Sequence, residues 1–263
     1  MTTMPSSRAS APTAPGPRVE VLGCSIDALT MQETVARCAQ LVESGAYSQH
    51  MAINAAKLVK LRDDAWLADI VAGCELVNAD GQAVVWASRA LGTPLPERVA
   101  GVDLMQELFG LAEARGWPIF ILGAKRDVLD AALTVIGERH PTLVIAGSRD
   151  GYFADDEVGD VCDKIRTSGA RMLFVAMGTP RKEYFLGEHG PTLGVPFVMG
   201  VGGSIDVVAG ITKRAPVLWQ RAGLEWLYRL LQEPRRMLRR YVTTNTQFVV
   251  LVARQALRRR AAR

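Results

Sequence analysis

Short apolar runs alternate with longer amphipathic segments along most of this 263-residue chain. The runs have the length of buried β-strands, and the amphipathic segments repeat their apolar positions every three to four residues, as one-sided helices do. This alternation predicts an α/β fold in which helices cover both faces of a mostly parallel sheet. The predicted strands are Val19–Leu22, Ser48–Ile53, Leu76–Asn78, Ile119–Leu122, Thr142–Ala146, Met172–Ala176 and Phe197–Met199. The predicted helices lie near residues 30–44, 55–72, 81–91, 103–116, 126–139, 155–168 and 181–188.

The pattern changes after the last predicted strand. A glycine-rich turn, Gly200–Ser204, precedes a short helix, and a longer helix is predicted from about Val217 to Arg229. Pro234 interrupts this helix, because proline lacks the N–H that the preceding turn would bond. The first 17 residues are rich in Ser, Ala, Pro and Thr without apolar periodicity, which indicates disorder. The predicted organisation is a disordered lead (1–17), an α/β domain (18–216) and a helical appendage (217–263).

The end of the chain concentrates positive charge. Ten arginines, no lysine and one glutamate lie between Arg229 and Arg263, a local formal charge of +9, although the whole chain carries +4. Such an arm attracts polyanions: membrane headgroups, diphosphates or nucleic acid. Apolar residues such as Leu231 and Phe248–Leu251 interleave with the arginines, and this pattern suits a lipid interface better than nucleic acid. We therefore expect the arm to bind an anionic membrane surface and no nucleic acid.

Composition argues against several other classes. No apolar core of about 7–15 residues follows the first basic residue, so a secretory signal is not expected. The apolar run Phe248–Ala253 is far shorter than the roughly 20 residues of a membrane-spanning helix. The four cysteines lack Cys-x-x-Cys spacing and the three histidines lack His-x-x-x-His spacing, which argues against zinc and for buried, reduced thiols. We expect a soluble or peripheral protein with no metal and no other cofactor.

Polar residues directly follow several predicted strands. Ligands of open α/β folds bind outside the carboxyl ends of the strands, so such residues are candidates for a site. They are Asn54, the segment Asn78-Ala-Asp80-Gly81, Gly123-Ala-Lys125 and Met177-Gly-Thr-Pro180.

Asp80 is the leading candidate for acid–base chemistry. A carboxylate at a strand end can act as a general base toward a substrate hydroxyl. A helix is predicted directly after it, so a structural role as the helix N-cap is an equally good interpretation. The residues around Asp80 leave both interpretations open.

Arg98 follows a Gly- and Pro-rich loop, Gly92–Pro96, and is therefore placed to approach a pocket. Arginine suits bidentate binding of phosphate. A surface salt bridge with Glu97 or Asp103 is the alternative. Asp103 itself is predicted to cap a helix, with Gln106 at the capping-box position.

Two further segments are predicted to reach the same edge of the sheet. Gly202 and Gly203 lie in a turn whose N–H groups suit an anion, although a plain tight turn is the simpler interpretation. Asp206, one turn later, is either a helix-dipole partner or a ligand to substrate hydroxyls. Pro180 fits a helix start, which would place Lys182 and Glu183 near the ligand edge unless they form an ordinary solvated first turn.

Taken in order, these motifs resemble the WecG/TagA/CpsF glycosyltransferases (family 26, GT-E fold). The resemblance spans residues 20–245 nearly continuously, and the ordered set is more specific than any single motif. The matching stretches are Asn54-Ala-Ala-Lys57, Asn78-Ala-Asp80-Gly81, Pro96-Glu-Arg98-Val-Ala-Gly-Val-Asp103-Leu-Met, Phe120-Ile-Leu-Gly123, Gly151-Tyr-Phe153, Gly178-Thr-Pro-Arg-Lys-Glu183, Gly200-Val-Gly-Gly-Ser-Ile-Asp206-Val-Val-Ala-Gly210, Lys213-Arg-Ala-Pro216, and Gly223-Leu-Glu-Trp-Leu-Tyr-Arg229 through Glu233-Pro-Arg-Arg236 to Arg240-Tyr241.

The resemblance implies a membrane-associated, inverting transferase that needs no metal. It would move a sugar from a UDP donor to a polyprenyl-diphosphate-linked sugar, as a peripheral enzyme on the cytoplasmic face of the plasma membrane. Asp80 matches the family's proposed general base, which deprotonates the acceptor C4 hydroxyl, and Asn54 and Arg98 match residues that line the active site. Other matching positions imply further substrate contacts at Lys57, Lys182, Glu183, Gly202, Gly203 and Asp206, and arginines that stabilise the diphosphates at Arg229, Arg236 and Arg239.

Two positions bear on the donor sugar. Ala52 and Lys182 stand where teichoic-acid members carry Thr and Gln, and the surrounding motifs are more similar to the xanthan-type branch represented by the GumM β-glucosyltransferase. That branch implies UDP-glucose as donor, glucosyl-diphosphate-polyprenol as acceptor and a β-1,4-linked lipid disaccharide for exopolysaccharide. The alternative is a UDP-N-acetylmannosamine-type transferase for teichoic acid or an enterobacterial-antigen-like polymer.

Two classes other than a glycosyltransferase are possible alternatives for this sequence. A nucleic-acid-binding protein would use the arginine arm, and its binding would fall steeply with salt. A dinucleotide-dependent oxidoreductase would need G-x-G-x-x-G after the first strand, and none is present.

The appendage also bears on assembly. An apolar helix face at Trp219, Trp226 and Leu230 must pack on the chain itself, on a neighbouring subunit or on lipid. We predict a homo-oligomer that shields this face in solution.

Overall fold

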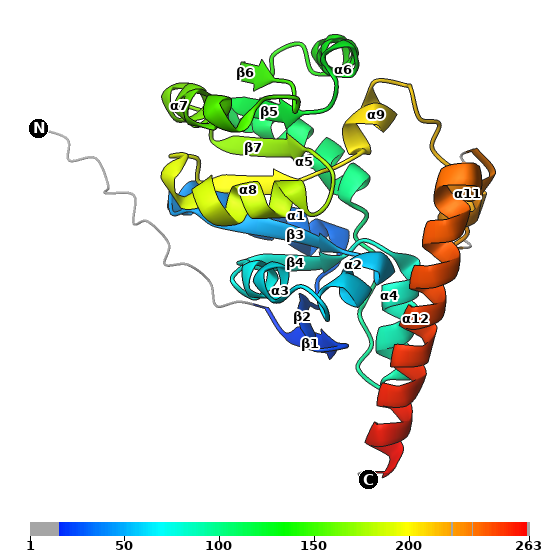
Figure 1. Cartoon of the computed structure of the whole chain (residues 1–263). Coiled ribbons are helices and arrows are strands. Elements are labelled where there is room, and N and C mark those ends of the chain that lie inside the picture. The colour runs from blue at the N-terminus through cyan, green and yellow to red at the C-terminus, as the bar shows by residue number, and fades with distance from the viewer. Residues whose placement is uncertain (1–15, 222, 233, 262–263) are drawn as a thin grey trace, which may run out of the picture.

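The computed structural model describes residues 16–221, 223–232 and 234–261, so most of the predicted lead lies outside the described residues. Six parallel strands form one sheet in the order β4-β3-β8-β7-β5-β6, which confirms the predicted α/β fold (Figure 1). The strands are β3 (Ser48–Ile53), β4 (Leu76–Ala79), β5 (Ile119–Gly123), β6 (Ile145–Arg149), β7 (Met172–Ala176) and β8 (Phe197–Gly200).

The predicted strand Thr142–Ala146 begins and ends three residues before β6, the strand that the structure has there. Gly147 of β6 packs against the ring of Phe120. A Cβ added to Gly147 would lie 2.7 Å from that ring, which is too close for any residue other than glycine.

The first predicted strand is half of a hairpin. β1 (Arg18–Val21) pairs antiparallel with β2 (Cys24–Asp27), a strand that the sequence pattern did not predict. Leu22 and Gly23 both have positive φ, 53° and 83°, as a two-residue hairpin turn of this twist requires. Asp27 Oδ2 accepts the N–H of Val77 at 2.7 Å, which attaches the hairpin to β4.

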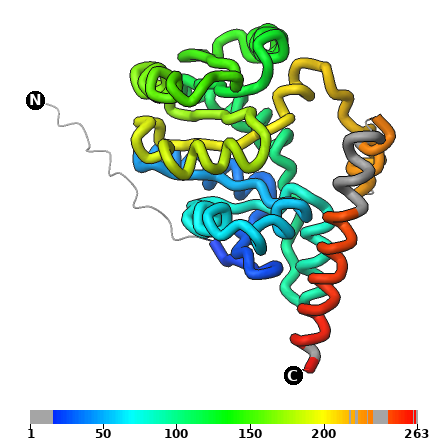
Figure 2. Tube along the Cα trace, viewed as in Figure 1, coloured from blue at the N-terminus to red at the C-terminus, as the bar shows by residue number. Residues whose placement is uncertain are grey.

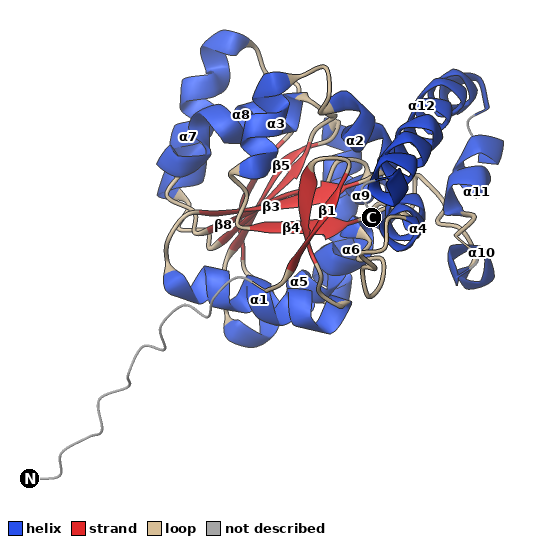
Figure 3. Ribbon diagram, turned by 90° about the horizontal axis from the view of Figure 1, so that it is seen from below, coloured by secondary structure: helices blue, strands red, loops and turns tan. Residues whose placement is uncertain are grey.

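Helices cover both faces of the sheet, as predicted (Figure 3). Successive residues of a strand point to opposite faces, and in β5 Ile119 and Ile121 join one core cluster whereas Phe120 and Leu122 join another. The first cluster includes α1 (Met31–Ser44), α5 (Gly101–Arg115), α6 (Arg126–Arg139) and α9 (Ser204–Val208). The clusters of the other face include α2 (Ala55–Lys60), α3 (Ala65–Ala72), α4 (Gln82–Ala90), α7 (Val158–Thr167) and α8 (Arg181–His189), and two short 3-10 helices complete the domain, η1 (Asp155–Glu157) and η2 (Gly190–Thr192).

The predicted helix over 55–72 is two helices. The Asn54 side chain caps α2 and the Asp64 side chain caps α3, by accepting the N–H of Lys57 and Leu67 at 3.0 Å each. A side-chain cap of this kind marks a helix start. The polar stretch between the two helices is therefore a break and not the solvent face of one long helix.

The appendage consists of α10 (Val217–Arg221), α11 (Glu225–Gln232) and α12 (Pro234–Ala261). The predicted continuous helix from Val217 to Arg229 is interrupted by Gly223, whose φ is +71°. A Cβ at this position would lie 2.7 Å from Gln82 and 2.9 Å from Trp86, so only glycine lets the appendage approach α4 this closely. Pro234 begins α12, where its missing N–H breaks no helical bond.

α12 packs along α2 and α4, although these helices are far apart in the sequence (Figures 1 and 2). Phe248 is 5% exposed in the core cluster that contains α2, and Leu251 and Val252 pack against the same cluster. Arg259 Nη1 donates to the carbonyl of Leu91 at 2.7 Å. This side of α12 therefore packs on the domain, and only its other sides can contact a membrane.

Val249 and Leu257 are exposed, so α12 also carries apolar side chains directed away from the domain. No helix in the described part of the chain has the length and apolar character needed to cross a membrane.

Candidate active site

Two predicted site residues meet at the carboxyl ends of β3 and β4. Asp80 N donates to the carbonyl of Ile53 at 2.8 Å, which ties the end of β4 to the end of β3. A Cβ on Gly81 would lie 3.4 Å from Asn54 Cβ, so the two strand-end motifs are in contact. The structure thus brings Asn54 and Asp80 together at the edge where ligands of such folds bind.

Asp80 does not cap the helix that follows it. The N-cap of α4 is Gly81, which makes no side-chain cap bond, and Asp80 Oδ1 instead accepts the N–H of Gly101 at 2.8 Å. Gly101 begins α5, whose N-terminus favours a negative charge. The bond orients the carboxylate through one oxygen, and Oδ2 makes no hydrogen bond with any of the described residues. This geometry leaves Oδ2 available to a substrate hydroxyl.

Arg98 pairs with a residue that the sequence did not indicate. Its Nη1 lies 2.6 Å from Glu225 Oε2, at the start of α11, so neither Glu97 nor Asp103 is its partner. Asp103 lies inside the first turn of α5 and is not its N-cap, which is Ala100. Both carboxylate oxygens of Asp103 instead accept from the guanidinium of Arg214.

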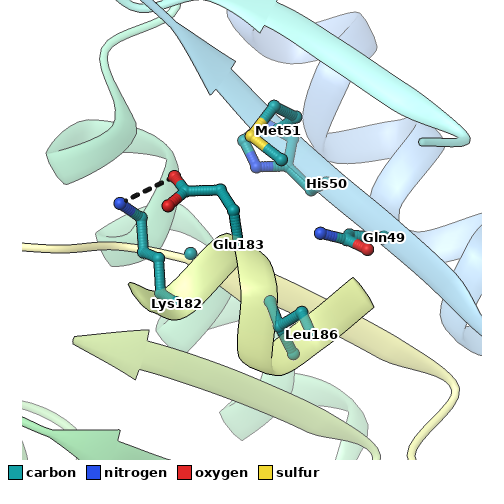
Figure 4. A pocket seen from close by; sticks show the side chains of 7 residues that line it. Gln49, His50, Met51, Lys182, Glu183 and Leu186 are labelled. Carbon is teal, nitrogen blue, oxygen red and sulfur yellow. Dashed lines mark ion pairs between the residues drawn. The ribbon is translucent and has the colours of Figure 1, made fainter. Parts of the chain in front are cut away.

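Behind the site, Lys57, Glu183 and Lys182 form a buried ionic cluster (Figure 4 draws Lys182 and Glu183). Glu183 Oε1 lies 2.9 Å from the Nζ of each lysine. The side chains of Lys57, Glu183 and Lys182 are 6%, 1% and 9% exposed. Lys182 and Glu183 are therefore not an ordinary solvated first turn.

The charges of this cluster are set by burial and by each other. Burial by itself raises the pKa of Glu183, but the ammonium groups of Lys57 and Lys182 outweigh it and lower that pKa to about 2. Burial and the charge of Lys57 lower the pKa of Lys182, and Glu183 and Asp80 oppose this shift. Glu183 is thus a carboxylate at neutral pH, and two lysines share its one negative charge.

The glycine turn does not offer the row of N–H groups expected of an anion site. The N–H groups of Val201 and Gly202 both point to the carbonyl of Val175, and Ser204 N donates to Val201. The turn instead accommodates Lys182, because a Cβ on Gly200 would lie 3.0 Å from its Cδ and Cε. Gly203 lies beside Asp206, which sits in the first turn of α9, so both interpretations of Asp206 stay open.

A family model described as "Glycosyl transferase WecG/TagA/CpsF family" matches residues 19–262. The chain belongs to this family. Members of the WecG/TagA/CpsF family are glycosyltransferases that act on lipid-linked sugars, with a nucleotide-sugar donor. The matched range includes the appendage as well as the α/β domain, so Glu225 and Arg214 lie within the WecG/TagA/CpsF region together with Asp80.

The predicted diphosphate-binding arginines of this glycosyltransferase lie on the appendage. The backbone of Arg229 belongs to α11, and that of Arg236 and Arg239 belongs to α12. Their side chains lie outside the described part of the structure. Among the described residues, no three His, Cys, Asp or Glu side chains gather as a metal centre would require.

Sequence reasoning assigned no site role to Glu225, Arg214 or Thr179. Thr179 Oγ1 contacts both Lys182 Nζ and Glu183 Oε1. Each of the three residues lies within a motif that carries the family resemblance, which was the available signal. Their partners are far away in the sequence or buried beneath the site, and the motifs alone do not identify such pairs.

Proposed function

We propose that the protein is an inverting glycosyltransferase that moves a sugar, glucose by preference, from a UDP donor to a polyprenyl-diphosphate-linked monosaccharide. The product is a β-1,4-linked lipid disaccharide for exopolysaccharide synthesis. The observation that carries the proposal is the Asp80 carboxylate, held through Oδ1 by the N–H of Gly101 at the ligand edge of a WecG/TagA/CpsF family fold.

The chemical step needs one base. Asp80 takes the proton of the acceptor C4 hydroxyl, and the freed oxygen attacks the anomeric carbon of the donor from the face opposite the diphosphate. The new C–O bond forms as the bond to UDP breaks, and the inverted configuration at the anomeric carbon makes the linkage β. UDP leaves with the bonding electron pair, so the site must stabilise additional negative charge.

Cationic side chains of the same site supply that stabilisation. Arg98 lies on the loop before α5, where the N–H of the next residue, Val99, bonds the carbonyl of Ala79 directly before Asp80. Lys182 lies under the turn that follows β8. Arg229, Arg236 and Arg239 of the appendage would add further charge over the diphosphates. Fixed cations aimed at a developing charge lower the barrier because they need no reorganisation when the reaction occurs.

The appendage would hold the enzyme at the cytoplasmic face of the membrane. Leu218, Trp226 and Leu231 are exposed on α10 and α11, and the arginine-rich α12 continues from them. Exposed apolar side chains beside arginines bind the interface of an anionic bilayer. In solution the apolar face predicted at Trp219, Trp226 and Leu230 would be covered by a second copy of the chain.

The decisive experiment is a donor panel. Purified full-length protein is given a short-chain glucosyl-diphosphate lipid with UDP-glucose, UDP-N-acetylmannosamine or UDP-N-acetylglucosamine, and released UDP and lipid mass are measured. We expect UDP-glucose to be consumed fastest, with the lipid heavier by one hexose. Preference for UDP-N-acetylmannosamine would support the alternative branch, and the absence of any lipid product from all three donors would overturn the proposal.

A further inference from the structure

The two lysines of the buried cluster differ in how many hydrogen bonds they have left to make. An ammonium group has three N–H donors and no acceptor. Lys57 Nζ uses all three, toward Met51 Sδ at 3.1 Å, the carbonyl of Ala52 at 2.9 Å and Glu183 Oε1 at 2.9 Å. Lys57 is therefore saturated by the protein itself.

Lys182 is not saturated. Its Nζ contacts Glu183 Oε1 and Thr179 Oγ1, and no third partner exists among the described residues. Its stem passes under Gly200, and its Nζ lies 4.0 Å from the position that a Cβ of Gly202 would occupy. One N–H of Lys182 is thus left beside the turn that follows β8, at the ligand edge of the sheet.

The cluster also has an excess of positive charge. Two ammonium groups share a single carboxylate within hydrogen-bond distance, and the three side chains are almost fully buried. Asp80 also acts on Lys182, but without a hydrogen bond to it. A buried charge that is only partly compensated is costly, so an anion presented to the free side of Lys182 would be favoured. A sugar hydroxyl could accept the remaining hydrogen bond, but it would add no compensating charge.

We propose that Lys182 binds a phosphate oxygen of the donor's diphosphate, and that Glu183 and Lys57 are positioning residues that hold its ammonium group in place. The inference rests on the proposed function, which supplies the nucleoside diphosphate. The family resemblance implies that all three cluster residues contact substrate. The proposal instead gives the ligand contact to Lys182, with Glu183 and Lys57 acting through Lys182.

Binding of UDP alone, measured by calorimetry without acceptor, tests the role of Lys182. We expect Lys182→Met to weaken UDP binding roughly tenfold or more, the size expected for one charge-assisted hydrogen bond. Lys164→Met, which alters an exposed lysine on α7, should bind UDP as the wild type does. Equal binding by Lys182→Met and wild type would overturn the inference alone, whereas no UDP binding by the wild type would count against the proposed function.

The positioning role of Glu183 has a separate readout in the pH dependence of UDP binding. The charged groups that face Lys182 are Lys57 on α2, Glu183 beside it on α8 and Asp80 after β4. Removing the carboxylate in Glu183→Gln leaves Lys57 to repel Lys182, so the alkaline loss of UDP affinity should move to lower pH. An unchanged pH profile in a folded Glu183→Gln protein would assign Glu183 a purely structural role.

A further variant tests the placement of Lys182 without altering Glu183. Gly200→Ala introduces a Cβ 3.0 Å from Lys182 Cδ and Cε and must displace that flexible stem. We expect it to weaken UDP binding severalfold while the protein stays folded. Wild-type affinity in Gly200→Ala would contradict the placement of Lys182 at the diphosphate.

Discussion

The guanidinium of Arg98 lies 2.6 Å from the carboxylate of Glu225, and this ion pair joins the loop beside Asp80 to the first residue of α11. The two side chains are only 15% and 14% exposed. A second pair, Asp103 with Arg214, joins α5 to the segment before α10. We call these two pairs the clasp. Within this chain the appendage therefore docks at its own Asp80 edge.

If the clasp holds the appendage on the domain, removing one of its charges should release α11. Glu225→Gln removes the charge of a largely buried pair and should weaken docking of α11 by about 1–3 kcal/mol. We expect faster hydrogen exchange in 225–232 and lower transfer activity, with exchange in the sheet unchanged. Asp130→Asn is the matched control, because its pair with Arg126 is exposed on α6. Equal exchange in the two variants would show that the clasp does not hold the appendage.

Phe248 predicts that α12 contributes to the stability of the domain. It is 5% exposed within the core cluster of α2, so Phe248→Ala should lower the free energy of unfolding by roughly 3 kcal/mol. Val249→Ala removes an exposed side chain from the same turn and should change it by less than about 0.5 kcal/mol. Urea denaturation compares them, and similar values would mean that α12 is not docked as described.

The fold and part of the site follow from local pattern. Buried parallel strands are short continuous apolar runs, so their ends, and with them Asn54 and Asp80, can be located from the sequence alone. β2 has the sequence Cys24-Ser-Ile-Asp27, in which apolar and polar residues alternate, so it is not a continuous apolar run and was not predicted. The polar stretch before Asp64 also fits the solvent side of one long helix, so apolar periodicity alone does not separate α2 from α3.

The rest depends on contacts between residues far apart in the chain. Lys57 and Glu183 share a hydrogen bond, but nothing near either residue indicates that the other lies behind the same strand ends. The partners in the clasp also come from elements far apart in the chain, and no local pattern indicates that they pair. The arginine-rich arm was predicted to bind a membrane surface, but composition does not show that one side of α12 packs on α2 and α4.

His50 predicts how stability responds to acid. It is fully buried, its Nε2 lies 3.1 Å from Asn78 Oδ1, and burial lowers its pKa to about 4. Its pKa in the unfolded chain is about 6.5, so the unfolded state binds the proton first and stability falls as pH drops from about 6.5 toward 4. Between pH 7 and pH 5 this contributes a loss of about 2 kcal/mol.

Replacing His50 should remove that contribution. In His50→Asn the fall in unfolding free energy between pH 7 and pH 5 should be smaller than in the wild type by about 2 kcal/mol. The lowered pKa of Glu183 acts in a separate window, where stability is lost as pH falls from about 4.5 toward 2. An unchanged slope between pH 7 and pH 5 in His50→Asn would show that His50 is not the buried neutral group described.

The most direct test of the central claim is UDP release by Asp80→Asn with the preferred donor and the lipid acceptor. Asparagine keeps an oxygen for the N–H of Gly101, so folding and UDP binding should be retained while the base is lost. We expect kcat to fall by about 10²–10⁴, whereas Asp156→Asn, at an exposed carboxylate in η1, keeps wild-type turnover. Wild-type turnover in a folded Asp80→Asn protein would contradict the assignment of Asp80 as the base.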